Sequence, residues 1–172
     1  MEYYSLTDKD IKELFPNTNI MTYTELNDIN HIDEIFGEDG SCFLLYLTSG
    51  HYGHWCLLFK NDDKVINYFN SYGTEPDQDL LKIPKDALYE FDQDSPILFE
   101  LLADSGYHIQ YNDKQLQSRA EGISTCGSHC VTRLMNRDKT ATEYIKVLKK
   151  YKKPADLLVA IVTGYNLFGI LS

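Results

Sequence analysis

The chain has 172 residues, 43% of them hydrophobic and 24% charged, which is typical of a globular protein with one core, and we expect a single domain over residues 1–172. The first residues, MEYYSLTDKD, are acidic and polar rather than signal-peptide-like, and no apolar run approaches the ~20 residues that cross a bilayer. A net charge of −10 repels nucleic acid and argues against a nucleic-acid-binding function. We therefore expect an intracellular protein with no membrane partner, whose four cysteines are thiols, ligands or catalysts rather than disulfides.

The first 40 residues predict two helices. In SLTDKDIKELF, Thr7 is a plausible N-cap and Pro16 follows the end of the apolar pattern. In TELNDINHIDEIFG, residues 24–37, the apolar residues fall on one helical face and Gly37 provides a stop.

The middle of the chain predicts strands. CFLLYL, HWCLLF and KVINYF are short, apolar runs rich in aromatic or branched side chains, and residues 61–63 between the last two predict a hairpin turn. YHIQYN predicts a further strand, after a helix expected around residues 96–103. From Cys126 onward the pattern is helical again, so the order of elements predicts an α+β fold with a central, mostly antiparallel sheet flanked by helices.

The stretch STCGSHC lies where polar, turn-rich chain gives way to a helical pattern. A thiol attacks a carbonyl only as the thiolate, and a helix N-terminus lowers the thiol pKa. Cys126 follows the potential caps Ser124 and Thr125, and Gly127 allows close backbone approach. The backbone N–H groups at such a turn are potential oxyanion donors. The position therefore favours Cys126 as a nucleophile.

A nucleophilic cysteine needs a base and a group that orients the base. Among the five histidines, His54 begins a predicted strand directly after a glycine-containing turn. Asn70 falls near the end of the neighbouring predicted strand, so the hairpin would bring it within reach of His54. An amide can orient an imidazole through its oxygen.

GHW, FNSYG, a glutamine and STCG follow one another in this order. The pattern resembles the cysteine protease superfamily of adenovirus-type maturation proteases and ubiquitin-like-protein-specific proteases. The nearest resemblance is to the maturation proteases of virophages, polinton-like elements and related large DNA viruses, over most of residues 43–137. It implies His54 as base, Asn70 as orienting group and Cys126 as nucleophile of an adenovirus-protease-like fold.

The resemblance also assigns residues around this triad. Trp55 matches the aromatic residue that lines the substrate channel, with Gly127 beside the nucleophile. Gln117 matches the oxyanion glutamine, although it lies nine residues before Cys126, farther than in the family. Gln115 is the second candidate for that role. A further departure is Asn70, because the family usually has Asp or Glu there.

These matches imply a cysteine endopeptidase that processes capsid or other virion proteins and cuts after small residues such as glycine. We expect neither cofactor nor metal, and we expect the protein in the host cytoplasm, at the virus factory, and inside the virion. Adenovirus-type relatives use an activating peptide and DNA. The peptide is an open question here, whereas the net charge argues against DNA outside the basic stretch at residues 146–153.

Three alternatives remain open from the sequence. A deconjugase for ubiquitin-like modifiers would use the same chemistry, and an inactive relative acting as a binding module would explain the asparagine at position 70. A zinc-stabilised fold would take one group of metal ligands from three residues at helical spacing. It would take a second group of ligands from residues earlier in the chain. These candidate ligands are Cys126, His129, Cys130, His51, His54 and Cys56.

The remaining cysteines and His129 predict ordinary structural roles. Cys42 and Cys56 belong to apolar strand patterns, and Cys130 lies one helical turn after Cys126, so all three are expected in the core. His129 is expected on an exposed flank of its helix, without a role.

Overall fold

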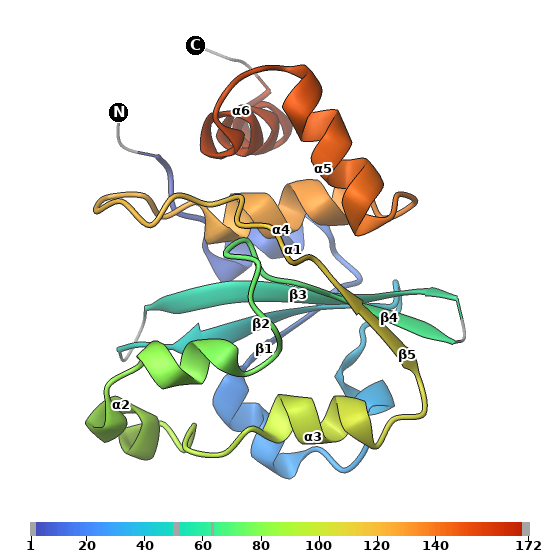
Figure 1. The fold of residues 1–172 in the computed structure, drawn as a ribbon, viewed down its shortest axis with the longest axis vertical. Helices are drawn as coiled ribbons and strands as arrows, with labels where there is room; N and C mark the ends of the chain where they lie inside the picture. The colour runs from blue at the N-terminus through green and yellow to red at the C-terminus, as the bar shows by residue number, and fades with distance from the viewer. Residues whose placement is uncertain (1–2, 50–51, 63, 170–172) are drawn as a thin grey trace.

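The computed structural model of the protein describes residues 3–49, 52–62 and 64–169. It has an α+β fold in which a five-stranded sheet lies between two sets of helices (Figure 1). Within the described residues, no helix combines the length and the apolar character that crossing a bilayer requires.

The sheet is mixed rather than uniformly antiparallel. Its strands follow the chain order and are β1 (Asn19–Thr22), β2 (Ser41–Leu47), β3 (Gly53–Asp62), β4 (Val65–Phe69) and β5 (His108–Tyr111). The three central strands pair antiparallel, as expected, whereas β1 and β5 run parallel to their neighbours at the two edges.

Alternate side chains of the central strands enter two separate hydrophobic clusters. On β3, Cys56 and Leu58 point to one cluster, while Leu57 and Phe59 point to the other. This period of two follows from the pleat of the strand. Because both faces are covered, the strands are apolar along almost their whole length.

Helices of different kinds cover the two faces (Figure 1). One face is covered by α1 (Asp8–Leu14), α4 (Cys126–Met135), α5 (Ala141–Lys150) and α6 (Ala155–Phe168). The other is covered by the 3₁₀ helices η1 (Tyr23–Asp28), η2 (Ile32–Ile35) and η3 (Gln78–Lys82), and by α2 (Lys85–Glu90) and α3 (Ile97–Ala103). Helix α4 packs on β3, and α6 packs on α4.

Most predicted elements are confirmed, and one helix is wrong. Thr7 caps α1 in a capping box, α3 begins after Pro96, and the three C-terminal helices are present. Residues 24–37 form two short 3₁₀ helices instead of one α-helix. Polar side chains here bond to the local backbone, as when Asn27 Nδ2 donates to the carbonyl of Thr24, and such bonds compete with a helix.

The hairpin between β3 and β4 is tighter than expected. Strand β3 continues to Asp62, whose carboxylate accepts hydrogen bonds from the N–H groups of Lys64 and Val65 at 2.7 and 3.1 Å. The part of the predicted turn at residue 63 lies outside the described residues. Strand β1 was not predicted, because its four residues, NIMT, lack a clear apolar alternation.

Candidate active site

Cys126 is the first residue of α4 and lies over β3. Thr125 is the N-cap, and Cys126 as a whole residue is 9% exposed. Gly127 makes this close packing feasible, since a Cβ there would lie 3.0 Å from Leu6 and 3.3 Å from Trp55. The first turn of a helix leaves backbone N–H groups without intrahelical partners, and these favour a negative charge on the sulfur.

His54 is the second residue of β3, and the start of this strand is fixed by a close backbone approach. A Cβ on Gly53 would lie only 2.0 Å from the carbonyl oxygen of Tyr46 on β2, so the position requires glycine. The imidazole Nε2 of His54 lies 2.9 Å from Asn70 Oδ1. The ring of Tyr72 stacks on the imidazole, with the two ring centroids 4.7 Å apart.

Asn70 follows β4 and is completely buried. Its Oδ1 also accepts a hydrogen bond from the N–H of Tyr72 at 2.9 Å. Its Nδ2 donates to Thr74 Oγ1 at 2.8 Å and to a carboxylate oxygen of Asp79 in η3. The amide is therefore oriented with its oxygen toward His54 and its nitrogen toward an acid.

The electrostatics favour a charged pair of thiol and imidazole. Burial raises the pKa of the Cys126 thiol, but the hydrogen bond and charge of His54 outweigh it, and the net pKa is below the ordinary value. Burial lowers the pKa of the His54 imidazole, but the thiols of Cys56 and Cys126 outweigh it, and the net pKa is well above the ordinary value. Because burial raises the pKa of Cys56, Cys126 is the thiol that ionises first.

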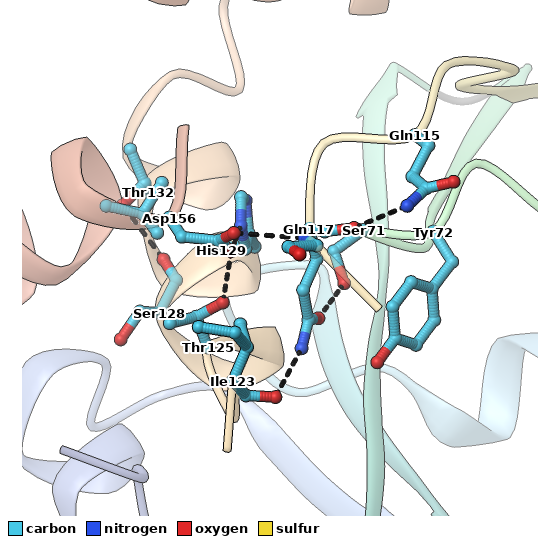
Figure 2. A network of polar contacts seen from close by, with 12 residues as sticks. Ser71, Tyr72, Gln115, Gln117, Ile123, Thr125, Ser128, His129, Thr132 and Asp156 are labelled. Carbon is cyan, nitrogen blue, oxygen red and sulfur yellow. Dashed lines mark hydrogen bonds and ion pairs between the residues drawn. The ribbon is translucent and has the colours of Figure 1, made fainter. Parts of the chain in front are cut away.

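Gln117 is buried beside this pair and is fixed by the segment that follows β4. Ser71 donates its hydroxyl to Gln117 Oε1 at 2.6 Å, and the Ser71 carbonyl accepts the N–H groups of Leu116 and Gln117. Gln117 Nε2 lies 3.4 Å from the carbonyl oxygen of Ile123 (Figure 2). Gln115 is exposed, and its amide donates instead to the Gln117 backbone.

A cavity of about 300 Å³ joins these groups. His54, Gln117 and Cys126 line it together, and Tyr72 and Asp79 line it as well. The residues lining the rest of it are Tyr46, Thr48, Gly53, Lys82, Ile83, Arg119, Ile123 and Ser124. Trp55 is 8% exposed and belongs to the hydrophobic cluster under α4, so its role in a substrate channel stays a prediction.

His129 is not on an exposed flank, and that prediction is wrong. The side chain is completely buried, and its Nε2 lies 2.9 Å from the carboxylate of Asp156 in α6. The same carboxylate accepts the Thr125 hydroxyl at 2.5 Å (Figure 2). It also accepts the backbone N–H of Ser118 at 3.0 Å. Position 129 faces inward because α6 covers α4, a long-range contact that local sequence does not reveal.

This placement bears on the zinc alternative. The ligand atoms of Cys126, His129 and Cys130 are not among those that gather closely enough to hold a metal ion in the described part of the chain. Among the residues that the structure describes, the group with ligand atoms within 4.8 Å of one another is His54, Cys56 and Asp79. His51, the other expected ligand, lies outside the described residues.

The three expected core cysteines, Cys42, Cys56 and Cys130, are buried free thiols. Cys56 also contributes to the surroundings of His54. Sequence reasoning missed Asp79, Ser71 and Asp156. For Ser71 a signal existed, since it lies inside the FNSYG block, whereas Asp79 and Asp156 belong to no motif.

The likenesses to solved structures are distant. No family model matches the chain. The chain is similar to the selenomethionine crystal structure of the African swine fever virus pS273R protease, with a TM-score of 0.45 and 17% identity over 82% of this chain. It spans 61% of that protease. It is also similar to the central domain of an uncharacterized Legionella pneumophila protein, with a TM-score of 0.36 and 12% identity over 92% of this chain and 96% of that one.

A virophage protein matches the chain nearly end to end. The uncharacterized protein V9 of Sputnik virophage is 37% identical over 171 residues, which cover 95% of this chain and 98% of that protein. The chain therefore belongs to the same family as protein V9 of Sputnik virophage.

Proposed function

We propose that the protein is a cysteine endopeptidase with Cys126 as nucleophile, His54 as general base and Asn70 as the group that orients the base. The observation that carries this proposal is that Cys126, His54 and Gln117 line one cavity, with Asn70 bonded to the histidine. His54 is hydrogen-bonded to Asn70 and interacts with the Cys126 thiol, and the Gln117 amide lines the same space.

The acylation step follows from this arrangement. His54 takes the thiol proton, and the sulfur of Cys126 attacks the scissile carbonyl carbon, so that the carbonyl π electrons move to its oxygen. Gln117 Nε2 and the backbone N–H of Cys126 donate to the resulting oxyanion. The intermediate collapses, the C–N bond breaks, and the His54 imidazolium gives its proton to the leaving amine.

Deacylation uses the same groups in reverse. His54 takes a proton from water, and the hydroxide attacks the thioester carbonyl at the oxyanion site. The C–S bond breaks, the acid product leaves, and the proton on His54 returns to the sulfur. The stacked Tyr72 ring and the Asn70 amide keep the imidazole in one orientation throughout.

The substrates we propose are capsid or other virion proteins, cut after small residues such as glycine. The family relationship to a virophage protein supports a virus-infected cell as the setting, including the virus factory and the virion. The preference for small residues is supported by the sequence resemblance alone. Because adenovirus-type relatives use an activating peptide, the requirement for such a peptide is tested by adding one to the assay.

The experiment is a cleavage-site survey. The purified protein is incubated with a proteome-derived peptide library, and mass spectrometry identifies new termini. Cleavage after small residues is expected for the wild type, none for Cys126→Ala, and unchanged cleavage for Cys42→Ala, which removes another buried thiol. Cleavage that survives in Cys126→Ala would refute the proposal, and activity confined to folded ubiquitin-like fusions would favour a deconjugase instead.

A further inference from the structure

We propose that Asp79 is a positioning residue that supplies, through the Asn70 amide, the negative charge which a triad of cysteine, histidine and asparagine lacks. This inference rests on the proposed function and concerns the same site. It explains how an asparagine can stand where the proteases that the chain resembles usually have an acid.

The hydrogen bonds of the Asn70 side chain allow one orientation of its amide group. Both of its N–H groups are used, one by Thr74 Oγ1 and one by the carboxylate of Asp79. Its oxygen accepts from the N–H of Tyr72 and faces the His54 ring. A flipped amide would turn its oxygen toward the carboxylate and its N–H groups toward other donors, which costs several hydrogen bonds. Asp79 therefore fixes the orientation of Asn70 Oδ1, the acceptor that holds the imidazole of His54.

The carboxylate is also close enough to act on the charge of the imidazole. An oxygen of Asp79 and a ring nitrogen of His54 lie within 4.8 Å of each other. Asp79 is 8% exposed, and water screens it less than a surface acid. Its cationic neighbour, Lys82, is 3.9 Å away with a half-exposed side chain, so this surface ion pair offsets the field only in part.

Other charged or titratable groups also face the ring. They are Cys56 on the same strand, Cys126 and His129 on α4, and Tyr72, over which the guanidinium of Arg119 lies at 4.1 Å. Asp79 is the acid among the described groups that both contacts Asn70 and approaches His54. Its removal should therefore leave the thiol in place and destabilise the imidazolium.

The test measures the pKa of His54 directly. The imidazole signals are titrated by NMR in protein that carries Cys126→Ala. The signal of His54 is identified as the one that disappears when His54→Gln is added. We expect Asp79→Asn to lower this pKa by about one pH unit or more. The double variant Asn70→Asp with Asp79→Asn moves the single carboxylate next to His54 and should restore the pKa. The matched control is Asp86→Asn, the same change at an exposed acid, and it should leave the pKa unchanged.

The second readout is cleavage in variants that keep Cys126. Asp79→Asn should lower kcat/KM about tenfold or more, and the double variant should recover most of it, which a purely structural role would not produce. An unchanged His54 pKa in Asp79→Asn would overturn the inference. If Asp79→Asn does not fold, a folded but inactive double variant would overturn it equally. A wild type without any cleavage would instead refute the proposed function, while the titration still decides the role of Asp79.

Discussion

At the scale of single residues, the reactivity of Cys126 is set by its neighbours. The helix N-terminus, the His54 imidazole and nearby backbone groups together outweigh burial, which alone would raise the thiol pKa. Cys130, one turn later and also buried, lacks these partners, and its pKa is raised well above the ordinary value. Identical side chains four residues apart therefore have opposite chemical tendencies.

Gln117 provides a prediction at this scale. Gln117→Ala should lower kcat about 100-fold, because it removes one donor to the oxyanion. It should also destabilise the protein by about 1–3 kcal/mol, since the buried hydroxyl of Ser71 loses its partner. Steady-state kinetics and denaturant unfolding measure the two effects. Gln115→Ala, at an exposed position, is the control and should retain wild-type kcat; the reverse pattern would assign the role to Gln115.

The residues of the candidate site could be predicted only as far as the motifs reach. His54, Asn70 and Cys126 lie in short blocks whose order was informative, and the structure brings them together. Asp79 lies in a polar stretch and reaches His54 through another side chain, a relation that spacing along the chain does not encode.

At the scale of elements, Asp156 of α6 is hydrogen-bonded to two other segments, helix α4 and the loop after Gln117. Its carboxylate binds α4 at the N-cap Thr125 and in the helix interior at His129 (Figure 2). It also binds the loop after Gln117 through the N–H of Ser118. Helix α6 therefore fixes both the nucleophile and the proposed oxyanion donor, although it contributes no residue to the cavity.

We predict that Asp156→Asn destabilises the protein by about 1–3 kcal/mol at neutral pH, because the amide cannot accept all three hydrogen bonds. Burial raises the pKa of Asp156, but the bonds from His129, Thr125 and Ser118 outweigh it and hold the pKa below 3.8. A carboxyl group whose pKa is lower in the folded state stabilises the protein at pH values above its unfolded-state pKa. This stabilisation is lost as the pH falls through the folded-state pKa.

His129 also titrates and is coupled to Asp156, so this comparison is made with His129→Gln present in both proteins. The stability difference caused by Asp156→Asn should then be constant above pH 3.8 and shrink below it. Denaturant unfolding at a series of pH values measures it, with exposed Asp138→Asn as the control. A difference that grows on acidification would contradict this assignment.

The elements themselves were predictable where the apolar period was strong. The central strands and the C-terminal helices follow directly from it. Residues 24–37 have a helical apolar period too, yet their asparagines and acids bond locally and divide the segment into η1 and η2. Local polar competition, which a hydrophobic pattern ignores, decided that segment.

At the scale of the whole molecule, the sheet has two hydrophobic cores, one on each face. Leu57 and Leu58 are adjacent on β3, both completely buried, and belong to different clusters. Leu57→Ala and Leu58→Ala should each cost about 2–5 kcal/mol, since each opens a cavity in a packed core. Denaturant unfolding tests this, with Leu81→Ala as the control because Leu81 is 86% exposed. A cost near zero for either buried leucine would contradict the two-core architecture.

The parallel edges of the sheet are also a property of the whole molecule. β1 and β5 reach their places through long connections, so their direction depends on how distant segments pack. The hairpin of β3 and β4 was predictable because its partners are adjacent in sequence. Local pairing could be inferred, and the direction of the edge strands could not.

The central claim is that Cys126 is an activated thiol paired with His54. The most direct measurement is the rate of iodoacetamide labelling at each cysteine of the native protein as a function of pH, by mass spectrometry. Because the pKa of Cys126 is lowered, its labelling should remain fast below pH 9.0, and His54→Ala should shift that dependence to higher pH. Labelling of Cys126 that is no faster than that of Cys130, or that is unchanged in His54→Ala, would contradict the account.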